Sequence, residues 1–285
     1  MTTDTSSTSG DPTIGKVLDD RDFVVTDVMI DDHFDGLALD RAAFDRGEAP
    51  VPSMISGGAD NFHGQSAFKQ DRGHLWMRQE WDLLSPLVRG DEYVASARIE
   101  DIYKRRDRTV VNTAMELKDA GGQVVIRSKH HQSFLLDEPN PEVELRDPSK
   151  KEGARKFQVP DGTEVTPLDR VITLEMCGKY FHGSRSYHTD LEASKELGFQ
   201  KVVVGGRLTM SYMGTLLEQH FGDAWWNGGR MDMKFTNPTW PDDHITVRGV
   251  ATGPAEDDAA REAVFAWIEK DDGTIVAIAD ASAPR

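Results

Sequence analysis

The sequence carries one short pattern twice. The segment from Pro86 to Asp91 has the same spacing as the segment from Pro238 to Asp243. From each proline to the next turn glycine, Gly122 or Gly273, the distances differ by one residue. Matched order and spacing indicate an internal duplication of a unit with one strand, a turn and three further strands. A duplicated unit restricts the chain to folds that contain two similar sheets.

Alternating apolar residues and turn signals predict the strands of both copies. In the first copy we expect strands over 75–81, 93–103, 109–117 and 123–134; in the second, over 233–235, 244–252, 263–269 and 274–281. A short strand over 23–25, partial helical spacing over 31–46 and an apolar run over 202–204 complete the pattern. Residues 53–75 show no clear preference.

One helix in the second half has a well-defined apolar face. The segment from Gly206 to His220 places apolar side chains at helical spacing: Leu208, Tyr212, Met213, Leu216 and Leu217. A buried helix with a curved antiparallel sheet around it is the hotdog arrangement. The expected fold class is therefore α+β, a double hotdog, and the first half lacks an equally clear helix, so its copy is expected to be degenerate.

Composition sets the expected boundaries. We expect a disordered tail over 1–18, an N-terminal hotdog-like half over 19–135 and a C-terminal half over 168–285. Residues 136–167 are rich in Pro, Glu, Lys and Asp and are expected to form a linker.

The net charge of −16 disfavours a nucleic-acid partner, because such a surface repels phosphate backbones. No apolar run predicts a membrane span, the start has no secretory signal, and the single cysteine excludes an internal disulfide. The expected location is the cytoplasm. An anionic ligand would need local basic residues. The candidates are the run from Lys104 to Arg108 and the pair Arg230 and Lys234, and the pair is assigned to substrate binding.

A polar cluster precedes the buried helix. Residues 184–190 read SRSYHTD, and a short helical segment, 191–197, follows them. The pattern predicts an imidazole in a loop that faces the amino end of the helix beginning at Gly206. A histidine can act as a base near neutral pH, and the unpaired amides of a helix start can bind an oxyanion.

Beyond position 170 the sequence resembles the MaoC-like and R-specific enoyl-CoA hydratase family. The resemblance lies in a set of ordered features: His188-Thr189-Asp190, Ala193, Gly198-Phe199, an apolar strand leading to Gly206 and its helix, Phe235, Pro238 and Asp243. It covers about residues 170–285, and 75–135 more loosely. The resemblance implies a hotdog fold and reversible hydration of a 2-enoyl thioester. It also implies CoA or an acyl carrier as the partner of the acyl group, with no metal or redox cofactor.

Three positions depart from the pattern of this family. The family places an aspartate five residues before the histidine, an asparagine three before it and a proline two before it. Here these positions hold Gly183, Arg185 and Ser186. The histidine is present, and its customary acidic partner is absent.

We assign His188 as the general base and the N–H of Gly206 as the oxyanion donor. The alternatives are a structural loop histidine and a glycine needed only for the turn. Tyr187 binds water or substrate, or packs. Arg185 and Ser186 are candidates to replace the missing pair, with solvent-facing loop residues as the alternative.

Asp190 is assigned to substrate binding or, preferably, to capping the helix that follows it. His182 and His188 lack a third ligand nearby, so no metal site is expected. The other histidines, His63, His74, His130 and His131, read as ordinary surface or core residues.

Two other functions stay open. A thioesterase on the same fold needs a carboxylate that activates water, and Asp190 or Glu192 is the candidate. A non-catalytic thioester-binding subunit is favoured by the glycine at 183. Whether two chains pair, as a homodimer or with another hotdog protein, is also open.

Overall fold

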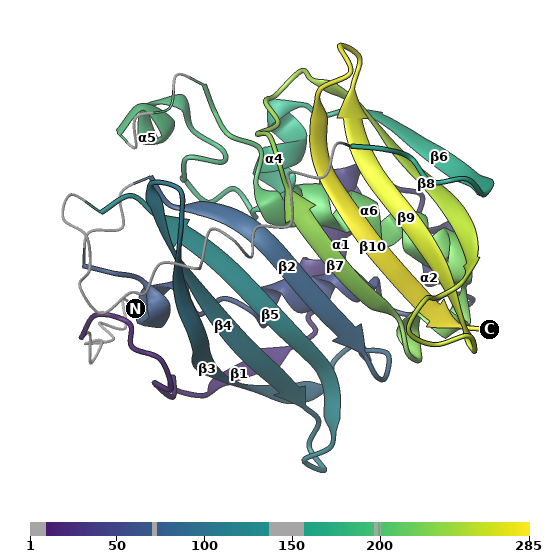
Figure 1. The fold of residues 1–285 in the computed structure, drawn as a ribbon, viewed down its shortest axis with the longest axis horizontal. Helices are drawn as coiled ribbons and strands as arrows, with labels where there is room; N and C mark the ends of the chain where they lie inside the picture. The colour runs from purple at the N-terminus through teal and green to yellow at the C-terminus, as the bar shows by residue number, and fades with distance from the viewer. Residues whose placement is uncertain (1–9, 70–72, 137–156, 197–198, 200) are drawn as a thin grey trace.

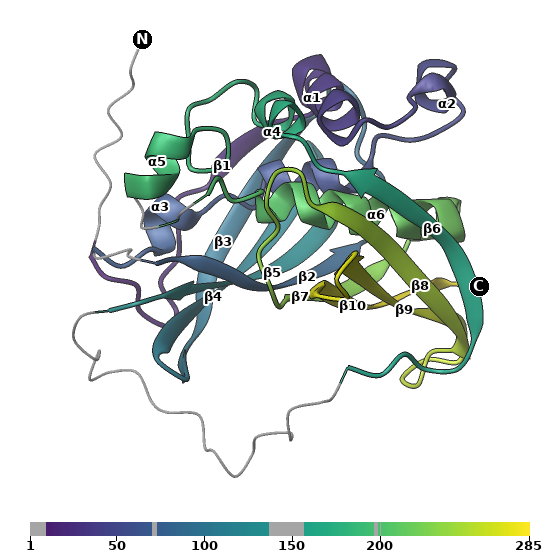
Figure 2. The ribbon, with the colours of Figure 1, turned by 90° about the horizontal axis from the view of Figure 1, so that it is seen from above.

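The computed structural model describes residues 10–69, 73–136, 157–196, 199 and 201–285. Its strands form one antiparallel sheet in the order β1-β3-β4-β5-β2-β7-β10-β9-β8-β6. Figure 1 shows the sheet face on, and Figure 2 shows the helices gathered on one of its faces. Within the described residues, no helix is both long and apolar enough to cross a membrane.

The strand order is symmetric about its centre. Five strands of the first half are followed by five of the second in reversed order, so each strand has a counterpart at the same distance from the β2–β7 pair. The strands are β1 Arg21–Val24, β2 Leu75–Leu83, β3 Glu92–Arg105, β4 Arg108–Lys118, β5 Val124–Phe134, β6 Thr163–Val171, β7 Arg230–Phe235, β8 His244–Pro254, β9 Arg261–Lys270 and β10 Ile275–Pro284. The predicted duplication and the double hotdog are confirmed.

Helix α6, Gly206–Phe221, lies against the sheet of the second half (Figure 2). Five side chains of its predicted apolar face are completely buried: Leu208, Tyr212, Met213, Leu216 and Leu217. Burying each of these stabilises the fold by about 1.5–3 kcal/mol relative to an exposed side chain. The predicted central helix of the second half is confirmed.

In the first half, a short 3-10 helix replaces the central helix. This segment, η1 Ser53–Gly58, packs against α6. The first amide of η1 is already bonded, because the N–H and hydroxyl of Ser53 both donate to Glu218 Oε1 of α6, at 2.7 and 2.6 Å. Burial raises the pKa of Glu218 to about 7. The first copy is degenerate at this helix.

Two further helices extend the repeat beyond what the sequence predicted. Helices α1, Asp27–Leu37, and α4, Leu174–Tyr180, begin after Thr26 and Thr173. Each threonine hydroxyl accepts a hydrogen bond from the amide three residues later, which is the usual N-cap. α1 and α4 pack against each other on the helix side of the sheet (Figure 2).

Four boundary predictions need correction. The helical spacing over 31–46 divides into α1 and α2, Ala42–Asp45, because Ala38 adopts a left-handed conformation with φ 51° and ends α1. Residues 202–204 form no strand: two of their amides bond to Tyr187 and Thr239 of neighbouring segments.

The other two corrections concern the tail and the linker. Gly15 N donates to Ile99 O and Leu18 is buried, so residues 10–18 are ordered against β3 rather than a disordered tail. β6 begins at Thr163, inside the predicted linker 136–167. Residues 1–9 and 137–156 lie outside the described part of the chain. The remaining helices are α3 His63–Ser66, α5 Leu191–Glu196 and α7 Asp223–Trp226.

An ion pair joins the two halves at the centre of the sheet. Glu80 of β2 lies directly opposite Asp232 of β7, and two like charges in this position repel. Arg78 bridges them, with Nε 2.6 Å from Asp232 Oδ1 and Nη2 3.2 Å from Glu80 Oε1. A hydrogen bond from His131, opposed by burial and assisted by Arg78, lowers the pKa of Glu80.

We expect Arg78→Met to lower the free energy of unfolding by about 1–2 kcal/mol, because two carboxylates are left facing each other. The value is modest because 32% of the Arg78 side chain is exposed. Urea unfolding measures it, and adding Asp232→Asn should recover most of the loss. As control, Arg248→Met breaks a pair with Glu269 away from the junction and should cost about 0.5 kcal/mol or less. Equal losses from both arginines would contradict this account.

Candidate active site

His188 lies in the loop before α5, close to the amino end of α6. Its Nδ1 is 2.8 Å from the carbonyl oxygen of Val203. Because a carbonyl can only accept, Nδ1 carries the proton and the neutral ring has its lone pair on Nε2. Within the described part of the chain, no hydrogen-bond partner occupies Nε2. The imidazole is therefore oriented by one nitrogen and available as a base at the other.

Aromatic rings enclose this imidazole. Phe181 stacks on it with the ring centroids 5.0 Å apart, and the centroid of Tyr187 lies at 3.8 Å. Burial lowers the pKa of His188 to about 4; the bond to Val203 opposes this shift, and the charges of His74 and Arg207 add to it. The ring is consequently neutral at pH 7.

The amino end of α6 presents unpaired amides. Gly205 is the N-cap and has no side chain to bond them, and the first amide bonded to its carbonyl belongs to Thr209. A Cβ built on Gly205 would lie 2.3 Å from Phe181 Cζ and 3.5 Å from His188 Cδ2. A Cβ on Gly206 would lie 2.8 Å from Trp76 Cε3. The base and the positive end of the helix dipole are thus direct neighbours.

The first half of the chain contributes to the same place. Trp76 covers Gly206 from β2, and His74 Nε2 lies 3.1 Å from the hydroxyl of Tyr187. Burial raises the pKa of Tyr187 to about 12, so the phenol stays protonated. From the sequence, His74 was expected to be an ordinary surface or core residue. Its partner is 113 positions away, and nothing in the local pattern marks it.

Three residues of the loop differ from the family pattern, and each has a structural role there. Gly183 is exposed and has φ 64°, with open space around it. Arg185 is 62% exposed and pairs with Asp190 at 3.0 Å. Ser186 Oγ accepts the amide of His188 and so shapes the turn. The ion pair with Asp190 engages the Arg185 guanidinium at the exposed side of the loop.

Asp190 caps α5, since its Oδ1 accepts the amide of Ala193 at 2.8 Å. This bond, opposed by burial and aided by Arg185, lowers the pKa of Asp190. Glu192, the other carboxylate considered for a thioesterase, is 68% exposed and pairs with Lys195. Both carboxylates are engaged on the outside of the loop.

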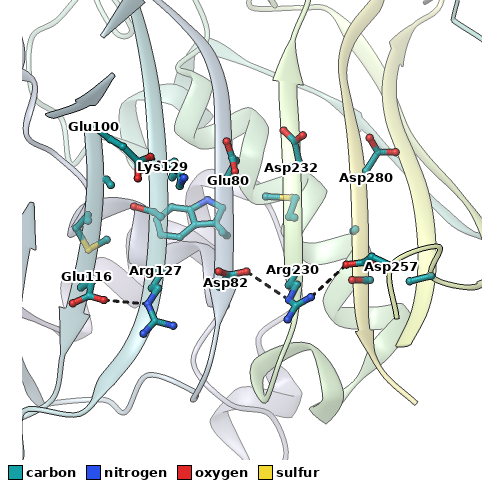
Figure 3. A pocket seen from close by; sticks show the side chains of 18 of the residues that line it. Glu80, Asp82, Glu100, Glu116, Arg127, Lys129, Arg230, Asp232, Asp257 and Asp280 are labelled. Atoms are coloured by element: carbon teal, nitrogen blue, oxygen red, sulfur yellow. Dashed lines mark hydrogen bonds and ion pairs between the residues drawn. The ribbon is translucent and has the colours of Figure 1, made fainter. Parts of the chain in front are cut away.

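Arg230 and Lys234 lie elsewhere. They alternate on β7 with Met231 and Met233, which are buried, so their side chains project from the other face of the sheet. Arg230 lies in a groove of about 1030 Å³ on that face, between Asp82 and Asp257 (Figure 3). Their assignment to substrate binding beside His188 does not fit the structure, because the sheet separates them from the imidazole.

Comparison with known protein families finds a match within the second half of the chain. Residues 184–268 match the model of the family described as MaoC like domain. The matched segment lies within the second half of the chain and resembles a MaoC-like domain. The match begins within the polar loop and contains His188, the amino end of α6 and strands β7 and β8. Among curated proteins, no sequence matches the chain significantly.

Solved structures agree on the fold of the whole chain. A MaoC-like dehydratase from Phytophthora capsici is 16% identical with a TM-score of 0.72, and the match covers 95% of each chain. Peroxisomal multifunctional enzyme type 2 of Drosophila melanogaster is 14% identical with a TM-score of 0.69, over 94% of this chain and 48% of the other. A conserved hypothetical protein of Mycobacterium tuberculosis with a double hotdog fold is 12% identical with a TM-score of 0.60, over 95% and 96%.

We expect Gly205→Ala to lower the free energy of unfolding of the protein by about 1–3 kcal/mol. The new methyl group collides with Phe181 and displaces this ring from its stack on His188. Thermal unfolding with near-UV circular dichroism measures both effects. Gly178→Ala in α4 is the matched control: a Cβ there meets nothing within 4 Å. It should stabilise the protein by about 0.5–1 kcal/mol. A neutral Gly205→Ala would show that Phe181 is free to move.

Proposed function

We propose that this protein is a hydro-lyase that adds water to, or removes it from, a 2-enoyl or 3-hydroxyacyl thioester. The observation that carries the proposal is the contact between an imidazole with an unoccupied Nε2 and the uncapped amino end of α6. The substrate is an acyl group on CoA or on an acyl carrier. The relatives described as MaoC-like dehydratases support this choice.

His188 is the base in this mechanism. In hydration, Nε2 takes a proton from water as the water oxygen bonds to C3 of the enoyl group. The hydrogen bond from Nδ1 to Val203 holds the ring in the required tautomer and stabilises the imidazolium that forms. Because burial lowers the pKa of His188 to about 4, its imidazole is unprotonated, and so able to accept a proton, throughout the neutral pH range.

The amino end of α6 stabilises the charge. As the C3–O bond forms, the π electrons of the double bond move toward the thioester oxygen and create an enolate. The N–H of Gly206 donates to that oxygen, and the helix dipole adds to its effect. Removing such a donor typically raises a barrier by about 3 kcal/mol. Trp76 covers Gly206 and limits the access of water to this bond.

Tyr187 supplies the proton that the missing aspartate cannot. Its phenol is protonated up to about pH 12 and is hydrogen-bonded to His74. Transfer of the phenolic proton to C2 completes the addition. Return of the proton from the His188 imidazolium to the tyrosinate, whose ring centroid is 3.8 Å away, restores both side chains. The reverse sequence removes water from a 3-hydroxyacyl thioester.

We expect His188→Ala to lower kcat for hydration of a 2-enoyl-CoA by about 10²–10⁴-fold, the usual contribution of a positioned base. The loss of ultraviolet absorbance from the conjugated thioester measures the rate. For the wild type, kcat/KM should be constant from pH 8 down to about 5 and fall only near pH 4, where the imidazole becomes protonated.

The matched control is His182→Ala, because that imidazole is 73% exposed in the same loop. It should leave the rate within twofold. A fully active His188→Ala protein with an unchanged melting temperature would refute the mechanism. Thiol release from saturated acyl-CoA would point instead to a thioesterase.

We expect Tyr187→Phe to lower kcat about 100-fold and leave KM within a few-fold, because the ring remains and only the proton is lost. Steady-state kinetics separate the two constants. His74→Ala should show a smaller loss in the same direction, since it removes only the partner of the phenol. Full activity of the phenylalanine variant would leave His188 as the single proton carrier.

A further inference from the structure

Arg207, the residue after Gly206, has no carboxylate partner among the described residues. Its Cζ lies 5.5 Å from the ring centroids of both Tyr180 and Phe181. Its guanidinium hydrogen-bonds to the side chain of Tyr180, and within the described part of the chain it forms no ion pair with a carboxylate. A half-buried guanidinium has five N–H donors to satisfy and usually binds a carboxylate or phosphate. Aromatic contacts and the Tyr180 side chain position this guanidinium, and that one hydrogen-bond partner satisfies only part of its five donors.

A small cavity adjoins the guanidinium. It measures about 70 Å³ and lies between η1 and helices α1, α4 and α6. Its lining includes Arg207, His33, Tyr180, Asp32 and Gly58. Glycines keep it open: a Cβ on Gly57 would lie 3.1 Å from Arg207 Cδ, and one on Gly58 would lie 2.9 Å from Met29 Cε. The space accepts a group the size of a carboxylate and excludes a nucleotide.

A second donor lines the same cavity. His33 is 3% exposed, and its Nδ1 is buried without a hydrogen-bond partner in the described residues. Burial lowers the pKa of His33 to about 3, so the ring is neutral. A buried polar atom left unpaired costs about 1–3 kcal/mol. A ligand oxygen that accepts from this ring would remove that cost.

The carboxylate among the lining residues, that of Asp32, is paired with a residue that does not line the cavity. Asp32 Oδ1 lies 3.3 Å from Nδ1 of His182, at the exposed side of the cavity. The hydroxyl of Tyr180 is engaged by Ser211 Oγ at 2.8 Å. Arg207 and His33 therefore remain as the two groups able to donate into the cavity.

The cavity lies beside the reacting atoms. Phe181 touches the guanidinium of Arg207 and stacks on the imidazole of His188. A thioester held by the amide of Gly206 with C3 at His188 would bring the following carbons of its acyl chain toward Arg207. At a net charge of −16, the protein attracts an anionic acyl group only where a cation is placed for it.

We propose that this cavity receives a carboxylate of the acyl group and that Arg207 selects for it. The substrate class is then a short dicarboxylic acid carried as a mono-thioester. This inference rests on the proposed thioester chemistry for its place in the reaction. Its test is a binding measurement, so it can fail or succeed independently of turnover.

The experiment is isothermal titration of the full chain with two non-reacting thioesters of equal length, butanoyl-CoA and the mono-CoA thioester of butanedioic acid. We expect the carboxylated ligand to bind about 10–100-fold more tightly, the range for charge-assisted hydrogen bonds. Arg207→Met should bring the ratio of the two Kd values close to one, and Arg207→Lys should restore part of it.

Arg41→Met is the matched control. Arg41 also lies 5.5 Å from an aromatic centroid, that of Phe34, but it is paired with Asp31 and Asp45. This variant should keep the wild-type ratio. The same titrations with pantetheine thioesters, which lack the nucleotide phosphates, identify the source of the anion.

We expect the wild type to prefer the carboxylated ligand on pantetheine as well as on CoA, and we expect Arg207→Met to lose this preference. Equal affinity of the wild type for both ligands would overturn the inference. The inference would also be overturned if Arg207→Met weakened the binding of CoA thioesters but not of pantetheine thioesters, because Arg207 would then bind a CoA phosphate. Neither result would affect the case for hydration, which depends on His188.

Discussion

The pairing of β2 with β7 is the constraint on which the rest of the structure depends. It joins two five-stranded sheets into one and aligns their symmetric strand orders about a single pair of carboxylates, Glu80 and Asp232. Arg78 offsets the repulsion between these carboxylates by forming an ion pair with each of them. With β2 fixed against β7, Trp76 at the start of β2 reaches Phe235 of β7 and the first residue of α6. The amino end of the buried helix is therefore covered by the other half of the chain.

The candidate site consequently belongs to neither half alone. The second half contributes the imidazole of His188, the phenol of Tyr187 and the uncapped amino end of α6. The first half brings Trp76, His74 and the glycines beside Arg207. The proposed mechanism uses these contributions in place of the acid that the loop lacks at Gly183. A sheet shared by both halves holds these groups on a rigid frame, which catalysis by positioned donors requires.

Much of the fold was predictable because it is written in local patterns. The repeat, the strands after each proline and the apolar face of α6 follow from turn residues and periodicity. Contacts between distant segments left no such trace. His74 meets Tyr187 only after two sheets have joined, and no local pattern in the sequence marks the guanidinium of Arg207. Arg230 and Lys234 were misassigned because charge alone does not reveal which face of a strand a residue occupies. The position of His188 beside this helix was expected because the order of features from His188 to Gly206 resembles the MaoC-like pattern.

The bond between Ser53 and Glu218 gives the duplicated scaffold its asymmetry. A tandem of two hotdog units has two helix starts of the same origin. In this chain one of them is closed from within: α6 sends its own carboxylate onto the first amide of η1. An internal group in that position does what a bound anion would do, and it cannot diffuse away. Within the described residues, the first half thus lacks the open helix end that α6 presents in the second half, and the two copies of the duplicated unit are no longer equivalent.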